Sequence, residues 1–458
     1  MKIIIAICWF LIFTKLLFFW LWLWQLKEYH LGRFRAHFES QALRKILSSF
    51  RRIKYPKFTL KIIIIFFSCL FAEILLLWYF SLLSAVILTF FLIPLLILSF
   101  QIPSAIWRQI IIKKAKKKRS KFKKLLVIGI TGSYGKTSTK EFLAQILSSK
   151  FKVLRTKEHQ NSEIGISQCI LNDLKEEGEE DKSSSSPFAV AREHEIFIVE
   201  MAAYSKGGIK LLCDIAKPKI GIVTGVNEQH LATFGSMENL LSAEGGKELI
   251  ESLPEDGMAF FNAKNKYCLE LYEKTLRRGS GQAFLYGKNA AFLGEENVLG
   301  AMAVARELGM GDDEIRQSVE KIKNKFPGIE IRKGLNGLTV IDASYSANPT
   351  GVMAHLDYLA LHYPQGKKII VMPCLIELGK ASARIHRKIG EKIKEVCDLA
   401  IITTKDRFKE IKEGAGEKAI LIENAKEIFQ KLKEFFGKSN VILLESRVPS
   451  ELIKDLLI

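Results

Sequence analysis

The sequence predicts an α/β protein with parallel sheets, preceded by about three transmembrane helices. Short apolar segments alternate with helical segments after residue 125, and this alternation is typical of parallel βαβ units. A glycine-rich loop follows the first of these strands and opens a helix, as in nucleotide-binding folds. The residues before the loop are mostly apolar or basic, which indicates membrane segments.

The positive charge of the chain is confined to its N-terminal part. The formal net charge is +19 over 458 residues. Residues 1–124 contain 22 Lys and Arg but only 3 Asp and Glu, and the remainder is neutral. Because this excess accompanies apolar segments, it indicates a membrane rather than a groove for nucleic acid. The 7 cysteines include no C-x-x-C pair, which argues against a zinc site and a disulfide framework.

Three apolar segments are long enough to cross a bilayer. Residues 3–24 are apolar apart from Lys15, and the apolar stretch that follows residue 61 is long enough for two spans, at about 62–80 and 83–101. A cleaved signal peptide is the alternative for the first segment, but no small-residue cleavage site follows it. Glu73 is the only charge inside the second stretch. We leave two interpretations open, a functional carboxylate or a residue that faces a neighbouring helix.

Two basic segments flank these spans and predict the orientation of the chain. Residues 27–57 and 108–124 are rich in Lys and Arg, and such segments face the cytoplasm. The first is expected to lie along the anionic inner leaflet. Three spans place both segments, and all that follows, on the cytoplasmic side of a multi-pass membrane protein. A nucleic-acid role for the lysine run is the weaker alternative.

The stretch GITGSYGKTSTKEFL, residues 129–143, has the features of a phosphate-binding loop. Glycines allow backbone N–H groups to surround phosphate oxygens, Lys136 supplies positive charge, and Thr137 supplies a hydroxyl for Mg²⁺. The spacing departs from the common P-loop pattern, because Ile130 stands where its first glycine belongs. The predicted nucleotide-binding residues of the loop are Gly132, Ser133, Gly135, Lys136, Thr137 and Ser138.

Two further residues are expected beside the phosphates. Glu200 lies in the apolar strand at 195–201, and a carboxylate at the C-terminal edge of a central strand is suited to hold Mg²⁺. His230 follows another strand of the same sheet, at 219–225. The alternatives are an ordinary charged strand end and a structural histidine. The predicted metal ligands are therefore Thr137, Glu200 and His230.

Several motifs in one order resemble the Mur ligases, which are ATP-dependent amide-forming enzymes of peptidoglycan synthesis. The likeness covers about residues 125–410, and the pattern SYSANP after Asp342 is nearest to the members that add D-alanyl-D-alanine to UDP-N-acetylmuramoyl-tripeptide. In chain order the matching stretches are GITGSYGKTSTKEFL, NSEIGIS, IVEMAAYSKGGI, IAKPKIGIVTGVNEQHLATFGS, LIESLPEDGMAFFNAKN, IDASYSANPTGVMAHL and IELGKASARIH.

This resemblance implies a P-loop ATPase domain followed by a Rossmann-like ligase domain. It also implies that a substrate carboxylate attacks the γ-phosphate of ATP, and that an amine then attacks the acyl phosphate. By position, Lys136, Glu200 and His230 take the catalytic roles. The resemblance assigns nucleotide contacts to Asn297 and Asp342, in addition to the loop. Residues that match substrate-contacting positions are Asn161, Tyr345 and Asn348.

Two departures from the family concern the substrate and the metal. The family's N-terminal domain, which holds the UDP-sugar, is absent, and apolar segments stand in its place. This leaves a lipid-linked or otherwise different substrate open. The segment that carries a carbamylated lysine in the family reads SAEGGKELIESLP, about two residues longer than usual. Lys247 is thereby displaced, and Glu244 is a candidate oxygen ligand in its place.

Two other departures concern groups near the nucleotide. The usual proline-glycine-arginine reads Pro327-Gly328-Ile329, so its arginine is missing unless Arg332 replaces it. Glu296 and Gly300 stand for a histidine and an asparagine of the family, and the chain before Gly294 is shortened. Loss of one cation at a phosphoryl-transfer site costs orders of magnitude in rate. Glu377 and His386 lie in a matching segment but have no assigned role.

We expect three parts: a membrane anchor at 1–124, a central ATP-binding domain at 125–326 and a ligase domain at 327–458. The leading hypothesis is an ATP- and Mg²⁺-dependent ligase that adds D-Ala-D-Ala or a similar amine to a muramyl peptide. The alternatives are a ligase of poly-amino-acid or folate tails and a nucleotide-binding membrane protein without turnover. The expected partners are the membrane and a small-molecule or lipid-linked peptide, with no nucleic acid.

Overall fold

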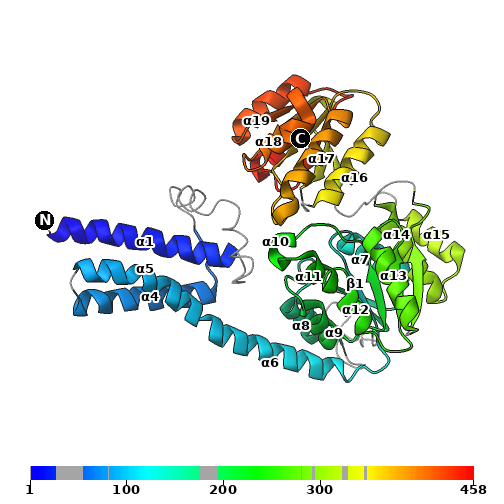
Figure 1. Ribbon diagram of the computed structural model, residues 1–458, viewed down its shortest axis with the longest axis horizontal. Helices are drawn as coiled ribbons and strands as arrows, with labels where there is room; N and C mark the ends of the chain where they lie inside the picture. The colour runs from blue at the N-terminus through cyan, green and yellow to red at the C-terminus, as the bar shows by residue number, and fades with distance from the viewer. Residues whose placement is uncertain are drawn as a thin grey trace, which may run out of the picture. The chain divides into compact units, whose positions relative to one another are not determined.

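The computed structural model describes residues 2–26, 55–80, 82–175, 194–279, 281–290, 294–321, 329–344 and 348–457. Two compact units divide the chain at Lys113 and Lys114, and helix α6 (Gln101–Arg119) runs through the division. Most of the predicted basic segment at 27–57 lies outside the described residues. The elements are labelled in Figure 1.

The first unit is built from apolar helices that share a buried carboxylate. Its other helices are α1 (Lys2–Leu26), α4 (Leu60–Tyr79) and α5 (Leu82–Ser99). Glu73 of α4 is 4% exposed, and its carboxylate accepts hydrogen bonds from Trp9 Nε1 of α1 at 2.8 Å and from Thr89 Oγ1 of α5 at 2.7 Å. Both carboxylate oxygens are therefore satisfied by neighbouring helices, which supports the structural interpretation of Glu73.

Two helices among the described residues are long and apolar enough to cross a membrane by length and composition. They are Leu60–Tyr79 and a helical stretch at Phe91–Arg119, while Trp9–Gln25 is a shorter apolar helix. The helices at Phe91–Arg119 and Trp9–Gln25 overlap the predicted spans at 83–101 and 3–24 only in part. Three spans therefore stay a prediction.

The first sheet of the second unit is parallel, with the order β2-β3-β1-β4-β5-β6. The first strand in sequence lies at its centre, between β3 and β4. Strands buried on both faces carry near-continuous apolar runs, such as IFIVE in β3. The strands are β1 (Leu126–Thr131), β2 (Val153–Arg155), β3 (Ile196–Glu200), β4 (Ile220–Val223), β5 (Met258–Asn262) and β6 (Gln282–Tyr286).

Helices cover both faces of this sheet. On one face α7 and α14 pack in a common core with β1, β3, β4 and β5. On the other face Leu249 of α12 lies close over Gly129 and Gly221, where a Cβ atom would crowd it. The helices of this part are α7 (Lys136–Leu147), α8 (Glu163–Asn172), α9 (Gly208–Ala216), α10 (Leu231–Phe234), α11 (Met237–Ser242), α12 (Lys247–Glu251), α13 (Lys266–Arg278), α14 (Glu295–Glu307) and α15 (Asp312–Glu320).

The second sheet is mixed, with the order β11-β10-β9-β12-β8-β7. Strand β7 runs antiparallel to β8, and the other pairs are parallel. All four side chains of β7 are exposed and three are charged, which suits an edge strand joined to β8 by a short turn. Its strands are β7 (Glu330–Lys333), β8 (Thr339–Ala343), β9 (Lys368–Met372), β10 (Leu399–Ile402), β11 (Ala419–Leu421) and β12 (Val441–Glu445).

Two apolar clusters, one on each face, bury this second sheet. The α/β prediction is thereby confirmed for the second sheet, with the antiparallel edge as the difference. Its helices are α16 (Pro349–His362), α17 (Ser382–Val396), α18 (Phe408–Ala415), α19 (Ala425–Leu432) and α20 (Ser450–Leu456), and short 3₁₀ turns lie at Leu335–Gly337, Gly379–Ala381, Gly416–Lys418 and Lys433–Phe435.

His386 of α17 is part of this core. Its side chain is 0% exposed; Nε2 accepts a hydrogen bond from the Leu375 N–H at 2.9 Å, and Nδ1 lies 2.7 Å from the Ser382 carbonyl oxygen. A neutral ring that donates from Nδ1 satisfies both contacts. Burial lowers the pKa of His386 below its usual value.

This lowered pKa predicts an acid-sensitive contribution to stability. Above pH about 6.5 the ring is neutral in both states, and the contribution is complete. As the pH falls toward the folded pKa, the unfolded chain binds the proton first, so stability is lost. His386→Gln keeps an acceptor without a titrating group, so we expect its melting temperature to fall less than that of the wild type between pH 7.5 and 5.5. Equal falls would contradict this assignment.

Candidate active site

The glycine-rich loop connects β1 to α7 in a conformation that requires glycine. Gly132 has φ +145° and Gly135 has φ +79°. A Cβ atom at Gly132 would collide with Thr224 Oγ1, and one at Gly135 would collide with Asn297 Oδ1. Within the described residues no side chain caps the start of α7 at Gly135, and the N-terminus of a helix favours an anion.

Lys136, at the start of α7, lies beside a buried carboxylate. Its Nζ donates to the Gly132 carbonyl oxygen and lies 4.0 Å from Oε1 of Glu244. Glu244 is 1% exposed, and its Oε2 has no hydrogen-bond partner among the described residues. A buried carboxylate with one unsatisfied oxygen is costly unless a cation completes it. The structure therefore places Glu244 beside the loop, whereas Lys247 is exposed.

Glu200, at the C-terminal end of β3, gathers three donors. Thr137 Oγ1 lies 3.1 Å from both carboxylate oxygens, and Asn161 Nδ2 donates to Oε1 at 3.3 Å. Lys140 Nζ lies 3.2 Å from Oε2. The structure therefore brings Thr137 and Glu200 together, and it adds Asn161, which the resemblance had matched only to a substrate-contacting position.

Lys140 is the residue that sequence reasoning missed. Its side chain is 1% exposed and also lies 3.3 Å from Oε1 of Glu141. The sequence feature that could have identified Lys140 is its spacing, because a residue four positions after Lys136 lies on the same side of α7. A buried cation at this position compensates the Glu200 carboxylate where no solvent can.

His230 is held by a carboxylate of the second sheet's domain. It has φ +64°, its Nδ1 lies 2.7 Å from Oε2 of Glu377, and its ring packs edge-on against Tyr204 at 6.0 Å. When Nδ1 donates to a carboxylate, Nε2 is left as an acceptor, which is the usual arrangement of metal-binding histidines. Glu377 thereby gains a role that the sequence did not assign.

Of the other predicted residues, one borders the loop, two make local structural contacts and one lies outside the described residues. Asn297 accepts a hydrogen bond from Thr139 Oγ1 at 3.2 Å and borders the loop. Asn348 caps α16 by accepting from the Gly351 N–H at 2.8 Å, and Asp342 Oδ1 accepts from the Ser344 N–H at 3.0 Å. For these two residues the described contacts are structural. Tyr345 lies outside the described residues.

Asn227 connects the loop with the second domain. Its carbonyl oxygen accepts from Ser133 Oγ at 3.4 Å. Its Nδ2 donates to Thr350 Oγ1 at 2.7 Å and to Asn348 Oδ1 at 3.5 Å. The backbone carbonyl and the side chain of this one residue after β4 therefore link a phosphate-binding residue to the start of α16.

The departures from the family have local explanations. Glu296 is buried, accepts from the Gly294 N–H at 2.6 Å, and has its pKa raised by burial. Gly300 lies against the ring of Tyr286, where a Cβ atom would crowd it, so a larger side chain does not fit. Arg332 pairs with Glu330 on exposed β7, and Pro327 and Gly328 lie outside the described residues.

A divalent cation fits this site only with help from a ligand. Within the described ranges no group of three or more His, Cys, Asp and Glu side chains could hold a metal by itself. Mg²⁺ is commonly bound by one or two carboxylates together with phosphates and water. Thr137, Glu200 and the unsatisfied oxygen of Glu244 fit that pattern.

Two domain comparisons decide the family. Residues 130–301 match the Mur ligase middle domain, and residues 329–447 match the Mur ligase, glutamate ligase domain. Together they cover more than half of the chain. This chain belongs to the Mur ligase family. The apolar first unit lies outside both Mur ligase matches.

The chain is similar to curated D-alanyl-D-alanine ligases over much of its length. It is 26% identical to the UDP-N-acetylmuramoyl-tripeptide--D-alanyl-D-alanine ligase of Bacillus subtilis, over 72% of this chain and 76% of that protein. The Synechocystis protein of the same name is 29% identical, but the match covers 58% of this chain and only 59% of that protein. The chain thus spans about three fifths of the latter relative.

Two crystal structures share the Mur ligase fold. MurF from Acinetobacter baumannii matches with a TM-score of 0.64 and 21% identity, over 76% of this chain and 80% of that chain. MurF ligase from Thermotoga maritima, in complex with ADP, matches with a TM-score of 0.61 and 23% identity, over 76% of this chain and 83% of that chain. At these identities the likeness concerns the fold.

The loop geometry predicts that Gly135→Ala impairs nucleotide binding. The substitution forces a Cβ atom onto Asn297 at a positive φ, so we expect the affinity for ATP to fall at least about tenfold, or 1.4 kcal/mol, in equilibrium titration. Gly207→Ala is the matched control, because Gly207 has φ +86° and also precedes a helix but has nothing within 4 Å of a Cβ atom. Equal losses in the two variants would attribute the effect to backbone strain alone.

Proposed function

We propose that this Mur ligase joins D-Ala-D-Ala, or a similar amine, to the carboxylate of a muramyl peptide at the expense of ATP. The observation that carries the proposal is the cluster at the C-terminal edge of the first sheet, where Lys136 and Thr137 meet the carboxylates of Glu244 and Glu200. The names of the relatives supply the amine and the peptide.

The chemistry explains why cations gather there. A substrate carboxylate oxygen attacks the γ-phosphorus of ATP, the bond to the β-phosphate oxygen breaks, and ADP leaves. The amine nitrogen then attacks the acyl carbon, inorganic phosphate leaves, and the amine loses a proton. Both reactants of the first step are anions, so Lys136 and the N–H groups of α7 must offset their repulsion.

A bound divalent ion supplies charge neutralisation between the phosphates and the attacking carboxylate. Thr137 and Glu200 are the residues that would hold it, and Lys140 and Asn161 fix the Glu200 carboxylate. Glu244, whose Oε2 has no partner in the described part of the chain, is suited to a second ion, and His230, oriented by Glu377, offers a nitrogen ligand of its own. Here Glu244 takes the place of the family's modified lysine.

The apolar first unit replaces the UDP-binding part of the family in this proposal. Residues 1–124 anchor the chain in a membrane through two or three spans, residues 125–326 bind ATP, and residues 327–458 complete the ligase. The lengths and composition of two apolar helices support the anchor. A membrane position favours a lipid-linked acceptor over a freely diffusing one, since anchoring raises the effective concentration of such a substrate.

Two rival functions predict different outcomes. A ligase of poly-amino-acid or folate tails would use the same phosphate chemistry with another amine. A non-catalytic nucleotide-binding protein would bind ATP without forming ADP, and the position of Ile329 in place of an arginine favours this rival.

The Lys136→Ala variant tests the ligase proposal. We expect wild-type protein to release ADP when ATP, Mg²⁺, D-Ala-D-Ala and a muramyl tripeptide are supplied, and the variant to be slower by at least about 100-fold, because one cation at the phosphates is lost. A panel of other amines, including glutamate, separates the ligase rivals. ATP binding by the wild type without ADP release under any combination would exclude the ligase function.

A pair of substitutions tests the assignment of the second cation site. We expect Glu244→Ala to weaken the binding of Mn²⁺ in the presence of a non-hydrolysable ATP analogue about tenfold or more, since it removes a carboxylate ligand. Lys247→Ala, in the same segment but exposed, should leave Mn²⁺ binding unchanged. Electron paramagnetic resonance of free Mn²⁺ measures both without turnover. The reverse pattern would restore the lysine to the metal site.

A further inference from the structure

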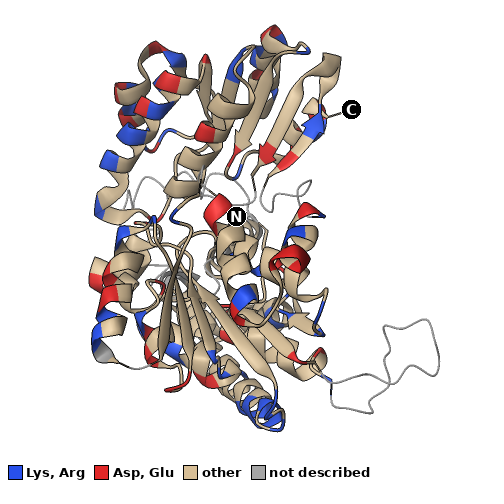
Figure 2. Cartoon of the chain, turned by 90° about the vertical axis from the view of Figure 1, so that its right-hand side faces the viewer, with Lys and Arg blue, Asp and Glu red and all other residues tan. Residues whose placement is uncertain are grey.

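The C-terminal end of α6 and the turn after it present a surface of lysines that the ligase chemistry does not use. Residues 101–124 contain ten Lys and Arg and no Asp or Glu. In Figure 2 this helix end stands out as a run of Lys and Arg. We call the exposed lysines of this surface in the second unit the basic face: Lys114, Lys117, Lys121, Lys123 and Lys124.

Buried hydrogen bonds fix the basic face to the ATP-binding domain. The Arg119 guanidinium donates to the carbonyl oxygens of Phe122 at 2.7 Å, Ala216 at 2.9 Å and Leu125 at 3.2 Å. Arg119 as a whole is 8% exposed. Lys118 Nζ donates to the Leu171 carbonyl oxygen at 3.0 Å. The helix end is therefore part of the domain, and its lysines project from a rigid base.

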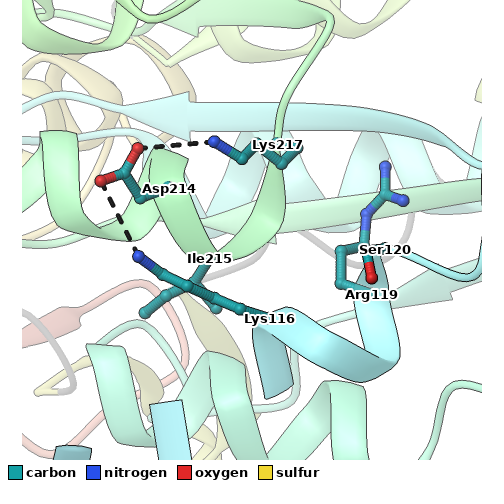
Figure 3. Close-up of a pocket in the computed structure, with 6 residues that line it drawn as sticks. All are labelled: Lys116, Arg119, Ser120, Asp214, Ile215 and Lys217. Atoms are coloured by element: carbon teal, nitrogen blue, oxygen red, sulfur yellow. Dashed lines mark ion pairs between the residues drawn. The ribbon is translucent and has the colours of Figure 1, made fainter. Parts of the chain in front are cut away.

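A shallow pocket of about 330 Å³ adjoins the basic face. It is drawn in Figure 3 and is lined by Lys116, Arg119, Ser120, Asp214, Ile215 and Lys217. Asp214 is the acidic group among these residues, and it lies 3.8 Å from Lys116 and 3.5 Å from Lys217. One carboxylate thus faces two ammonium groups, so the pocket adds to the positive charge of the basic face.

The sequence around the basic face identifies its partner. The helical stretch at Phe91–Arg119 is apolar enough to cross a membrane, and its charge is concentrated in the last turns of α6. Lysines that directly follow an apolar span lie at the level of lipid headgroups, where each is attracted to an anionic surface. The aromatic residue within the face, Phe122, is buried and offers no stacking surface to nucleic acid bases.

We propose that the basic face binds the phosphate headgroups of an anionic bilayer and so orients the catalytic domain on the membrane. This inference rests on the proposed membrane anchor. Lys123 and Lys124 precede β1, whereas the phosphate loop follows it. Six residues of strand separate them by roughly 20 Å. The headgroups and ATP therefore lie at opposite ends of the central strand β1, and bound headgroups leave the nucleotide site open.

The test uses the full chain in lipid nanodiscs, either zwitterionic or with anionic phosphatidylglycerol. Acetylation rates of Lys121 and Lys123, measured by mass spectrometry, report contact with headgroups. We expect both rates to be at least about threefold lower in anionic discs at 0.1 M salt, and to recover at 0.5 M salt as the attraction is screened. Equal rates in the two lipids would overturn the proposal.

Two triple variants distinguish binding by the basic face from a general effect of the protein's positive charge. Lys114→Gln, Lys117→Gln and Lys124→Gln together should abolish the protection of Lys121 and Lys123, while ATP affinity stays unchanged. The matched control carries Lys426→Gln, Lys433→Gln and Lys438→Gln in the second domain and should keep full protection. Protection that persists in the first triple variant, or that short DNA duplexes reproduce in zwitterionic discs, would overturn the assignment to lipid.

A negative result for the basic face can be distinguished from failure of the proposed ligase activity and from failure of the proposed membrane anchor. The ligase is read from ADP release, which does not enter this measurement. The anchor is read from resistance of the full chain to extraction by alkaline carbonate. A chain that is extracted, with no anionic protection of its lysines, would overturn both anchor and basic face. A resistant chain without protection would overturn the basic face alone.

Discussion

Compensation of buried charge at one edge of the first sheet is the constraint on which the site depends. Two carboxylates, Glu200 and Glu244, lie almost without solvent beside a loop that must receive a triphosphate. A carboxylate in such surroundings costs several kcal/mol unless paired. Lys136 and Lys140, one turn apart on α7, supply the pairing within the protein. The oxygen of Glu244 that has no partner among the described residues is the place in this compensation that a further cation suits.

The sheets were predictable where strands are buried on both faces. Strands such as β3 and β4 are near-continuous apolar runs, and the sequence locates them, at 195–201 and 219–225, to within one or two residues. Strands β2, β5, β6 and β7 were not recognised. Three of them, β2, β6 and β7, are edge strands with exposed side chains, and β5 lies within a stretch that was noticed only as a motif. The mixed character of the second sheet follows from β7 and was missed with it.

Local sequence patterns predicted which residues belong to the site, but they did not predict which of those residues contact one another. Glycines, a lysine and a hydroxyl at fixed spacing indicate a phosphate loop, and the end of a central strand indicates Glu200. The contacts of Lys140 with Glu200 and of His230 with Glu377 join residues 60 and 147 positions apart. Such pairs depend on how the elements pack, and a single sequence carries no record of that. At Asn348 and Asp342 the structure shows a helix cap and a turn contact, and their assigned roles in binding stay predictions.

The carboxylate shared by the apolar helices bears on how the first unit assembles. Glu73 takes its donors from two other helices, and neither donor lies on α4 itself. Alone in hydrocarbon, α4 would carry an unsolvated charge, or a proton in its place. In the proposed membrane anchor, the insertion of α4 is therefore more favourable when α1 and α5 arrive with it. The three helices would then leave the biosynthetic machinery as one bundle, and a chain truncated before residue 89 would be a substrate for membrane quality control.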